Sequence, residues 1–153
     1  MRNAAMRGLL GLCTICTLSV FSGCSQPIGP VAGEELDGTP SEWPQDWAFT
    51  ADIENVLIET RPEDPYSVTV WGTAVGEHLY VGASTRQATW AKNILENSAV
   101  VLSVNGQLYT ASATTVTDAQ EIEAVLMAIR TKYDVDSDDI LEDDSILFRL
   151  TKR

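Results

Sequence analysis

Residues 85–106 read TRQATWAKNILENSAVVLSVNG and contain most of a helix, a strand and a tight turn. The hydroxyl of Ser84 or Thr85 can cap a helix that runs to about Asn97, because a side-chain oxygen there accepts from an N–H group of the first turn. The spacing of apolar residues predicts which side of this helix is buried. That face is formed by Trp90, Ala91, Ile94 and Leu95.

The end of the same stretch predicts a β-hairpin. Residues 99–104 are rich in β-branched residues, which favour a strand. Asn105-Gly106 then supplies two residues that tolerate the positive φ angles of a type I′ turn. Residues 107–116 return as the second strand, so we expect the two strands to pair antiparallel.

The segments on either side complete a mostly β fold. Residues 55–60 predict a strand, and residues 67–74 and 79–83 predict another hairpin. After residue 116, Thr117 and Gln120 form a capping box for a second helix, and a last strand follows. The helix and the last strand are recognised by apolar residues at the matching spacing: Ile122, Val125, Leu126, Ile129 and Tyr133, then Ile146, Phe148 and Leu150. Six strands around one core predict a six-stranded antiparallel barrel with two main helices.

The start of the chain reads as an export signal. Arg2 and Arg7 precede an apolar run, residues 9–21, which is too short to span a bilayer, since that takes about 20 residues. The small residues before Cys24 resemble the lipobox of bacterial lipoproteins, although Phe21 stands where that family has an aliphatic residue. The resemblance implies cleavage before Cys24, which becomes the lipidated N-terminus. The alternative is an ordinary secretory signal.

Cleavage at that point divides the chain into three parts: a signal peptide (1–23), a disordered linker (24–45) and one folded domain (46–153). Residues 25–45 hold four of the six prolines, which is typical of a linker. In the lipoprotein family, Ser25 after the lipidated Cys implies transport to an outer membrane, where the domain would face the periplasm. Cys13 and Cys16 would be removed with the signal, which excludes a Cys nucleophile or a Cys-ligated metal in the domain.

Charge and histidine content exclude further classes of function. The formal net charge is −12, and cleavage would lower it to −14, because Arg2 and Arg7 leave with no acid. A chain this acidic will not bind nucleic acid through phosphates. No metal site is predicted: His78 is the single histidine, and residues 134–145 lack the Gly and the Glu at the sixth and twelfth positions of an EF-hand loop.

Several short motifs resemble one family. Residues 90–100 carry a Trp-x-x-Asn-Ile…Asn-x-Ala-Val pattern similar to a segment of the deazaflavin-dependent nitroreductase branch of the pyridoxamine 5′-phosphate oxidase-like split-barrel superfamily. Ser98 stands where Pro is usual. Segments of a related branch resemble Val70-Trp71, Leu79-Tyr80-Val81 and Lys132-Tyr133. The resemblance covers about residues 47–150 and implies a split barrel of the Greek-key type.

The resemblance also implies a cofactor and a homodimer. In that family FMN or a deazaflavin carries out hydride transfer in a groove at the dimer interface, and basic and hydroxyl side chains hold its phosphate. Arg86 would form paired hydrogen bonds with the phosphate, assisted by Thr85 at a helix start, with Lys92 as a second cation. The candidate cofactor-binding residues are Arg61, Ser84, Thr85, Arg86, Trp90, Lys92 and Asn93.

Two interpretations stay open. Where the nitroreductases have a phosphate-binding segment, this chain has Arg61 followed by Glu63 and Asp64, whose charges would repel a phosphate. Trp90 is also typical of a core residue, and Asn93 of a residue that bonds to neighbouring backbone. The protein is therefore either a redox protein that binds a flavin-type cofactor, or a non-enzymatic envelope module that binds another ligand or partner. The sequence assigns no catalytic residue.

Overall fold

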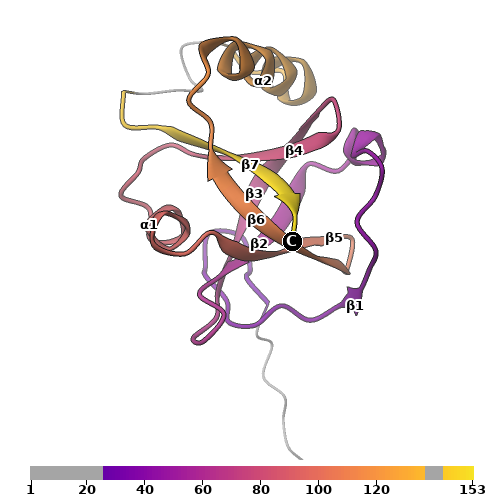
Figure 1. The fold of residues 1–153 in the computed structure, drawn as a ribbon, viewed down its shortest axis with the longest axis vertical. Helices are drawn as coiled ribbons and strands as arrows, with labels where there is room; N and C mark the ends of the chain where they lie inside the picture. Colours follow the sequence, from indigo (N-terminus) through magenta and orange to yellow (C-terminus); the bar gives the residue numbers. More distant parts are fainter. Residues whose placement is uncertain (1–25, 137–142) are drawn as a thin grey trace, which may run out of the picture.

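Six strands close into an antiparallel barrel (Figure 1). The structure is a computed structural model that describes residues 26–136 and 143–153. Neighbouring strands follow the order β6-β5-β2-β3-β4-β7, and β7 pairs back onto β6. The strands are β2 (Asn55–Thr60), β3 (Tyr66–Val75), β4 (His78–Ala83), β5 (Ala99–Val104), β6 (Gln107–Thr115) and β7 (Ile146–Lys152). The predicted fold class, a six-stranded barrel with two helices, is confirmed.

The two predicted hairpins form as expected. Asn105 and Gly106 both have positive φ angles, 50° and 76°, so β5 turns directly into β6 with Val104 opposite Gln107. The other hairpin turns at Gly76, whose φ of 58° favours glycine, and pairs Val75 with His78.

The helices α1 (Thr89–Glu96) and α2 (Ala119–Tyr133) start differently from the predictions. Ala88 precedes α1 and makes no side-chain cap, while the Thr85 hydroxyl accepts from the N–H of Gln87 in the preceding turn. The chain must first leave β4 through that turn, and the helix therefore begins later than residue 85. At α2 the cap is Asp118, whose carboxylate accepts from the N–H of Glu121 at 2.9 Å. The predicted Thr117–Gln120 capping box is wrong by one residue.

Two apolar clusters hold the elements together. The larger cluster fills the barrel and includes Trp47, Phe148 and the buried face of α1. The smaller one lies outside the barrel, where Val125 and Ile129 of α2 pack against Tyr80 and Leu147. In Figure 1 α2 accordingly lies beside β4 and β7, while α1 lies elsewhere on the barrel. The predicted buried face of α1 needs one correction: Leu95 is 52% exposed, and Asn93 is buried in its place.

The segment from residue 26 to residue 45 lies against the barrel, which differs from the disordered linker expected of it. The two-residue strand β1 (Thr39–Pro40) pairs with the start of β6, and Gly33 forms a bridge with Ser67 of β3. The buried Leu36 donates its N–H to the Glu59 carboxylate at 2.6 Å. Proline removes only its own N–H, so a Pro-rich segment can still pair through its other backbone groups.

Several expectations concern residues outside the described part. The signal segment, Cys24 and residues 137–142 of the acidic loop before β7 lie there. Within residues 26–136 and 143–153, no helix is long and apolar enough to cross a membrane. In the same ranges, no group of three His, Asp or Glu side chains is placed to hold a metal ion.

Candidate functional site: a groove over β3 and β4

A groove of about 580 Å³ lies over the outer face of β3 and β4. Alternate residues of a strand point to opposite faces, so Val68 and Val70 contact the barrel core while Thr69 and Trp71 point outward. The volume lies within the range of about 300–1,000 Å³ that is usual for small-molecule sites. The lining comprises Gly29, Pro30, Asn55, Thr69, Val70, Trp71, Thr73, Tyr80, Val81, Gly82, Ala83, Ser84, Ala88, Trp90, Ile129 and Leu147.

One wall of the groove is the indole of Trp71, which is 43% exposed although it is a large aromatic side chain. Its ring stacks on Tyr133 at the end of α2, with centroids 4.3 Å apart and planes 9° apart. The Tyr133 hydroxyl lies 2.9 Å from the carbonyl of Gly72 and 2.8 Å from that of Glu54. Burial raises the pKa of Tyr133, so the hydroxyl stays protonated and able to donate. Trp71 is therefore held in place by a ring that is itself anchored.

The second tryptophan at the groove is Trp90 of α1. It is 8% exposed and packs beside Phe148 of the barrel core, with ring centroids 5.8 Å apart. One turn further along α1, the buried Asn93 donates from its amide to the Thr60 hydroxyl at 2.9 Å, and Thr60 donates to the carbonyl of Tyr66. This chain of hydrogen bonds fixes α1, and with it Trp90, to the strands β2 and β3.

Between the two tryptophans, β4 presents little side-chain bulk. Gly82 is exposed, and a Cβ atom added there would lie 3.0 Å from Leu147 Cδ2. Ser84 follows on the same outward face and also lines the groove. A flat molecule can therefore approach the backbone of β4 beside the Leu147 side chain, with the Ser84 hydroxyl at one end of this strip.

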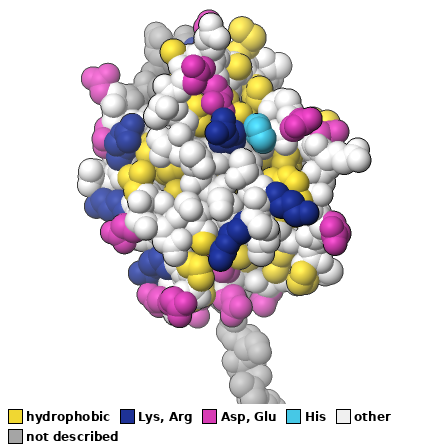
Figure 2. Space-filling view, viewed as in Figure 1, with side chains coloured by type: hydrophobic (Ala, Val, Ile, Leu, Met, Phe, Trp, Pro, Cys, Tyr) yellow, Lys and Arg dark blue, Asp and Glu magenta, His cyan; other side chains and the backbone are white. Residues whose placement is uncertain are grey.

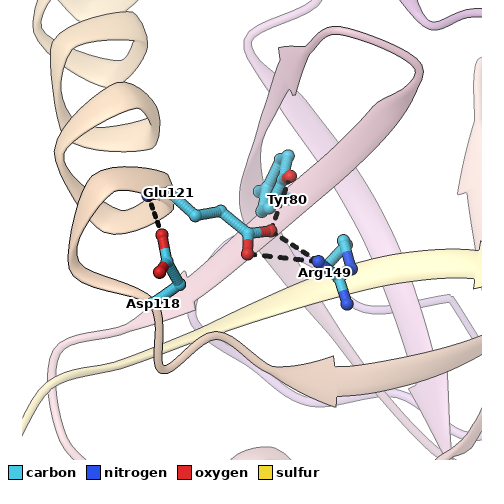
Figure 3. Close-up of polar contacts among 4 residues, drawn as sticks. All are labelled: Tyr80, Asp118, Glu121 and Arg149. Atoms are coloured by element: carbon cyan, nitrogen blue, oxygen red, sulfur yellow. Dashed lines mark hydrogen bonds and ion pairs between the residues drawn. The ribbon is translucent and has the colours of Figure 1, made fainter.

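A partly buried polar cluster, Tyr80–Glu121–Arg149, holds α2 at the edge of the groove (Figure 3). The Tyr80 hydroxyl donates to Glu121 Oε1 at 2.8 Å, and Arg149 Nη1 donates to both oxygens of the same carboxylate at 2.9 and 3.1 Å. Tyr80 is only 4% exposed, and burial with the Glu121 hydrogen bond raises its pKa to about 12. The cluster joins β4, β7 and α2, and its charges compensate one another.

The predicted phosphate-binding cations do not line this groove. Arg61 forms an ion pair with Asp64 at 3.1 Å and lies over the ring of Tyr66. Arg86 is exposed and borders a separate hollow of about 80 Å³ beside Ile122. Lys92 lies on the exposed face of α1.

Of the other predicted cofactor-binding residues, two line the groove and two form hydrogen bonds elsewhere in the fold. Ser84 and Trp90 line the groove. The Thr85 hydroxyl donates to the Asp144 carboxylate, and Asn93 bonds to Thr60. Trp71, Tyr80 and Gly82 were not predicted as site residues. Their outward position on β3 and β4 is visible in the alternation of the strands, but the position of α2 beside them is not.

Comparison with known proteins identifies solved structures of similar fold. No protein-family model and no curated protein sequence matches the chain. Among solved structures, a Listeria innocua protein named as a pyridoxamine 5′-phosphate oxidase superposes with a TM-score of 0.53 at 12% identity, covering 68% of this chain and 87% of the other. A conserved hypothetical protein from Mycobacterium tuberculosis gives 0.55 at 15% identity, with 78% and 85% covered.

A third similar structure comes from Bacteroides thetaiotaomicron and is named for 5-nitroimidazole antibiotic resistance. It superposes with a TM-score of 0.51 at 13% identity and covers 65% of this chain and 73% of the other. At these identities the likeness defines the fold alone. The chain is a split-barrel protein with an aromatic groove on the outer face of β3 and β4.

FMN is a cofactor that the family resemblance of the sequence implies. It fits this groove only in part. A flat ring fits, because Trp71 offers an exposed aromatic face and the exposed Gly82 adds no side chain of its own to the groove. The phosphate does not fit, because the lining contributed by the described residues contains no Lys or Arg.

Proposed function

We propose that this protein is a lipid-anchored envelope protein whose barrel binds a flavin-type ring in the groove over β3 and β4. The observation that carries the proposal is the fixed, exposed indole of Trp71 beside a strip of strand backbone at Gly82. Aromatic rings stack with a gain of about 0.5–1.5 kcal/mol beyond the area that they bury. A flavin ring, when bound, supplies hydride transfer.

In this proposal the chain's own residues position the ring. Trp71 stacks on one face of it, and Trp90 closes one end of the groove. The hydroxyls of Ser84 and Thr69 and the amide of Asn55 line the groove and are placed to bond the polar edge of a ring. Similarity to a protein named as a pyridoxamine 5′-phosphate oxidase supports a flat aromatic ligand for this fold.

The experiment is a fluorescence titration of the full-length chain, purified in a nonionic detergent, with riboflavin and FMN. Binding quenches flavin fluorescence, and Trp71→Ala is expected to weaken binding about three- to tenfold, because it removes one stacking partner. Phe49→Ala is the matched control, since Phe49 is an exposed aromatic residue that does not line the groove. If neither flavin is quenched, the barrel serves another ligand or partner, and the proposal is wrong.

The envelope location is proposed from the lipobox-like sequence before Cys24. Cleavage before Cys24 would leave a lipid on the chain only two residues before Gln26, the first described residue. Labelling cells with a radioactive fatty acid is expected to mark the wild-type protein and not Cys24→Ser. Label on the Cys24→Ser variant would contradict the anchor. The homodimer implied by the resemblance is also a proposal, and light scattering of the purified protein in detergent tests it.

A further inference from the structure

The charges around the groove lead to a more specific conclusion about the ligand, which rests on the proposed function. From the distribution of Lys and Arg we infer that the groove selects an uncharged planar ring system and discriminates against one that carries a phosphate. The ligands expected here share one chemistry: two or three fused rings that carry carbonyl or amide groups at the edge and no ionised substituent. Riboflavin and FMN contain the same ring and differ by one phosphate, so they form a matched pair of probes.

Every Lys and Arg outside the first 25 residues lies in the described part of the chain, and none of them lines the groove. Three are occupied by partners of their own. Arg61 bonds to Asp64, and Arg149 bonds to Glu121. Lys132 donates to the carbonyls of Thr50 and Gly72 at 2.8 and 2.6 Å.

The remaining cations are exposed on other parts of the surface. Arg86 lines a different hollow, and Lys152 and Arg153 border a third one beside Trp43. Lys92 and Arg130 lie on the exposed faces of α1 and α2. On the face shown in Figure 2, Lys and Arg side chains stand apart from one another and form no continuous patch.

The groove itself supplies uncharged groups. Its polar side chains are one amide, one phenol and the hydroxyls of Ser and Thr, and the rest of its surface is apolar or backbone. A phosphate placed there would be desolvated without an ion-pair partner, in a chain whose formal net charge is −12. An uncharged ring loses far less hydration and keeps the same stacking and edge contacts.

The test compares the dissociation constants of riboflavin and FMN for the full-length chain. We expect riboflavin to bind about threefold or more tightly than FMN at low salt, because the phosphate meets a negative field. Raising the salt from about 0.01 M to about 0.1 M shortens the Debye length from about 30 Å to about 10 Å, so FMN binding should tighten and riboflavin binding should not change.

A charge placed in the groove should reverse the order. Ser84→Arg puts a guanidinium at the end of the strip and is expected to make FMN the tighter ligand by about tenfold, through charge-assisted hydrogen bonds to the phosphate. Ser84→Gln is the matched control, because it adds a long uncharged side chain and should keep the preference for riboflavin.

The outcomes separate the preference for an uncharged ring from the proposed binding of a flavin-type ring. Tighter binding of FMN than of riboflavin to the unaltered chain would overturn the inference and leave the proposed function standing, and it would mean that a cation reaches the ligand from a second copy or a moved side chain. Binding of neither probe would overturn both. Preference for riboflavin that Ser84→Arg reverses would support both.

Discussion

The indole of Trp71 on β3 lies face to face with the phenol ring of Tyr133 on α2, with centroids 4.3 Å apart and planes 9° apart. The two residues lie far apart in the sequence, and each has a different second role. Trp71 lines the groove, while the Tyr133 hydroxyl bonds to backbone carbonyls of the strand region. The pair therefore connects the position of α2 to the shape of the ligand groove.

Removing the ring of Tyr133 should weaken both the fold and the ligand site. Tyr133→Leu is expected to lower the free energy of unfolding by about 1–3 kcal/mol and to weaken riboflavin binding, because Trp71 loses its stacking partner. Tyr133→Phe keeps the ring and loses only the hydroxyl, so it should cost about 1 kcal/mol and leave binding near wild type. Urea denaturation and the flavin titration measure the two effects. Equal loss of binding in both variants would contradict the role of the ring.

Asn93 is expected to act on stability and only indirectly on ligand binding. It is buried and donates to the Thr60 hydroxyl, so Asn93→Ala should lower the free energy of unfolding by about 1–3 kcal/mol, because it leaves a buried hydroxyl with one partner fewer. The neighbouring Lys92 is exposed, and Lys92→Ala should change stability by no more than about 0.5 kcal/mol. A loss in flavin affinity for Lys92→Ala would show instead that this cation reaches the ligand.

The raised pKa of Tyr80 predicts that the stability of the fold depends on pH in the alkaline range. Its folded pKa is about 12 against an ordinary value of 10.0, since burial and the hydrogen bond to Glu121 both favour the protonated phenol. The folded state therefore holds this proton more tightly than the unfolded state. The stability due to Tyr80 is fully present below pH 10 and is lost as the pH rises toward about 12.

The variant that tests this is Tyr80→Phe. At pH 8 it should cost about 1 kcal/mol through the lost hydrogen bond, and the difference from wild type should shrink as the pH rises above 10. Denaturation at several pH values measures that difference, in which the titration of all other groups cancels. A difference that stays constant from pH 8 to pH 11 would contradict the raised pKa.

The start of α2 offers a test that separates the sequence prediction from the structure. Asp118→Ala removes the carboxylate that accepts from the N–H of Glu121 and should cost about 1 kcal/mol. Thr117→Ala alters the residue that the capping-box pattern favoured, and it should cost much less, because Thr117 is exposed and Asp118 is the N-cap. Thermal denaturation of the two variants compares them, and a larger loss for Thr117→Ala would restore the original prediction.

The strands and turns were predictable because their signals are local. Asn105-Gly106 favours a type I′ turn by its own backbone preferences, whatever surrounds it, and the alternation in residues 146–150 is a property of one strand. The helix starts were less predictable. Asp118 and Thr117 can both cap a helix, and only the path of the chain out of β6 decides between them.

The groove was not predictable in the same way, because its parts come from separate elements. Nothing local distinguishes Trp71, which is 43% exposed, from Trp90, which is buried. The packing of α2 and α1 against the barrel decides the difference. The same holds for charge. Arg61 was a reasonable phosphate ligand by residue type, but in the folded chain it is paired with Asp64.

By itself, then, the sequence determined the order of strands and helices, the antiparallel hairpins and the acidic character, from which we expect no binding to nucleic acid. Each of these depends on neighbouring residues or on simple sums of charge. The tertiary structure decided which outward side chains of β3 and β4 are left uncovered, how residues 26–45 pack, and which cations already have partners. Those properties depend on contacts between residues distant in sequence, and such contacts exist only after the barrel has closed.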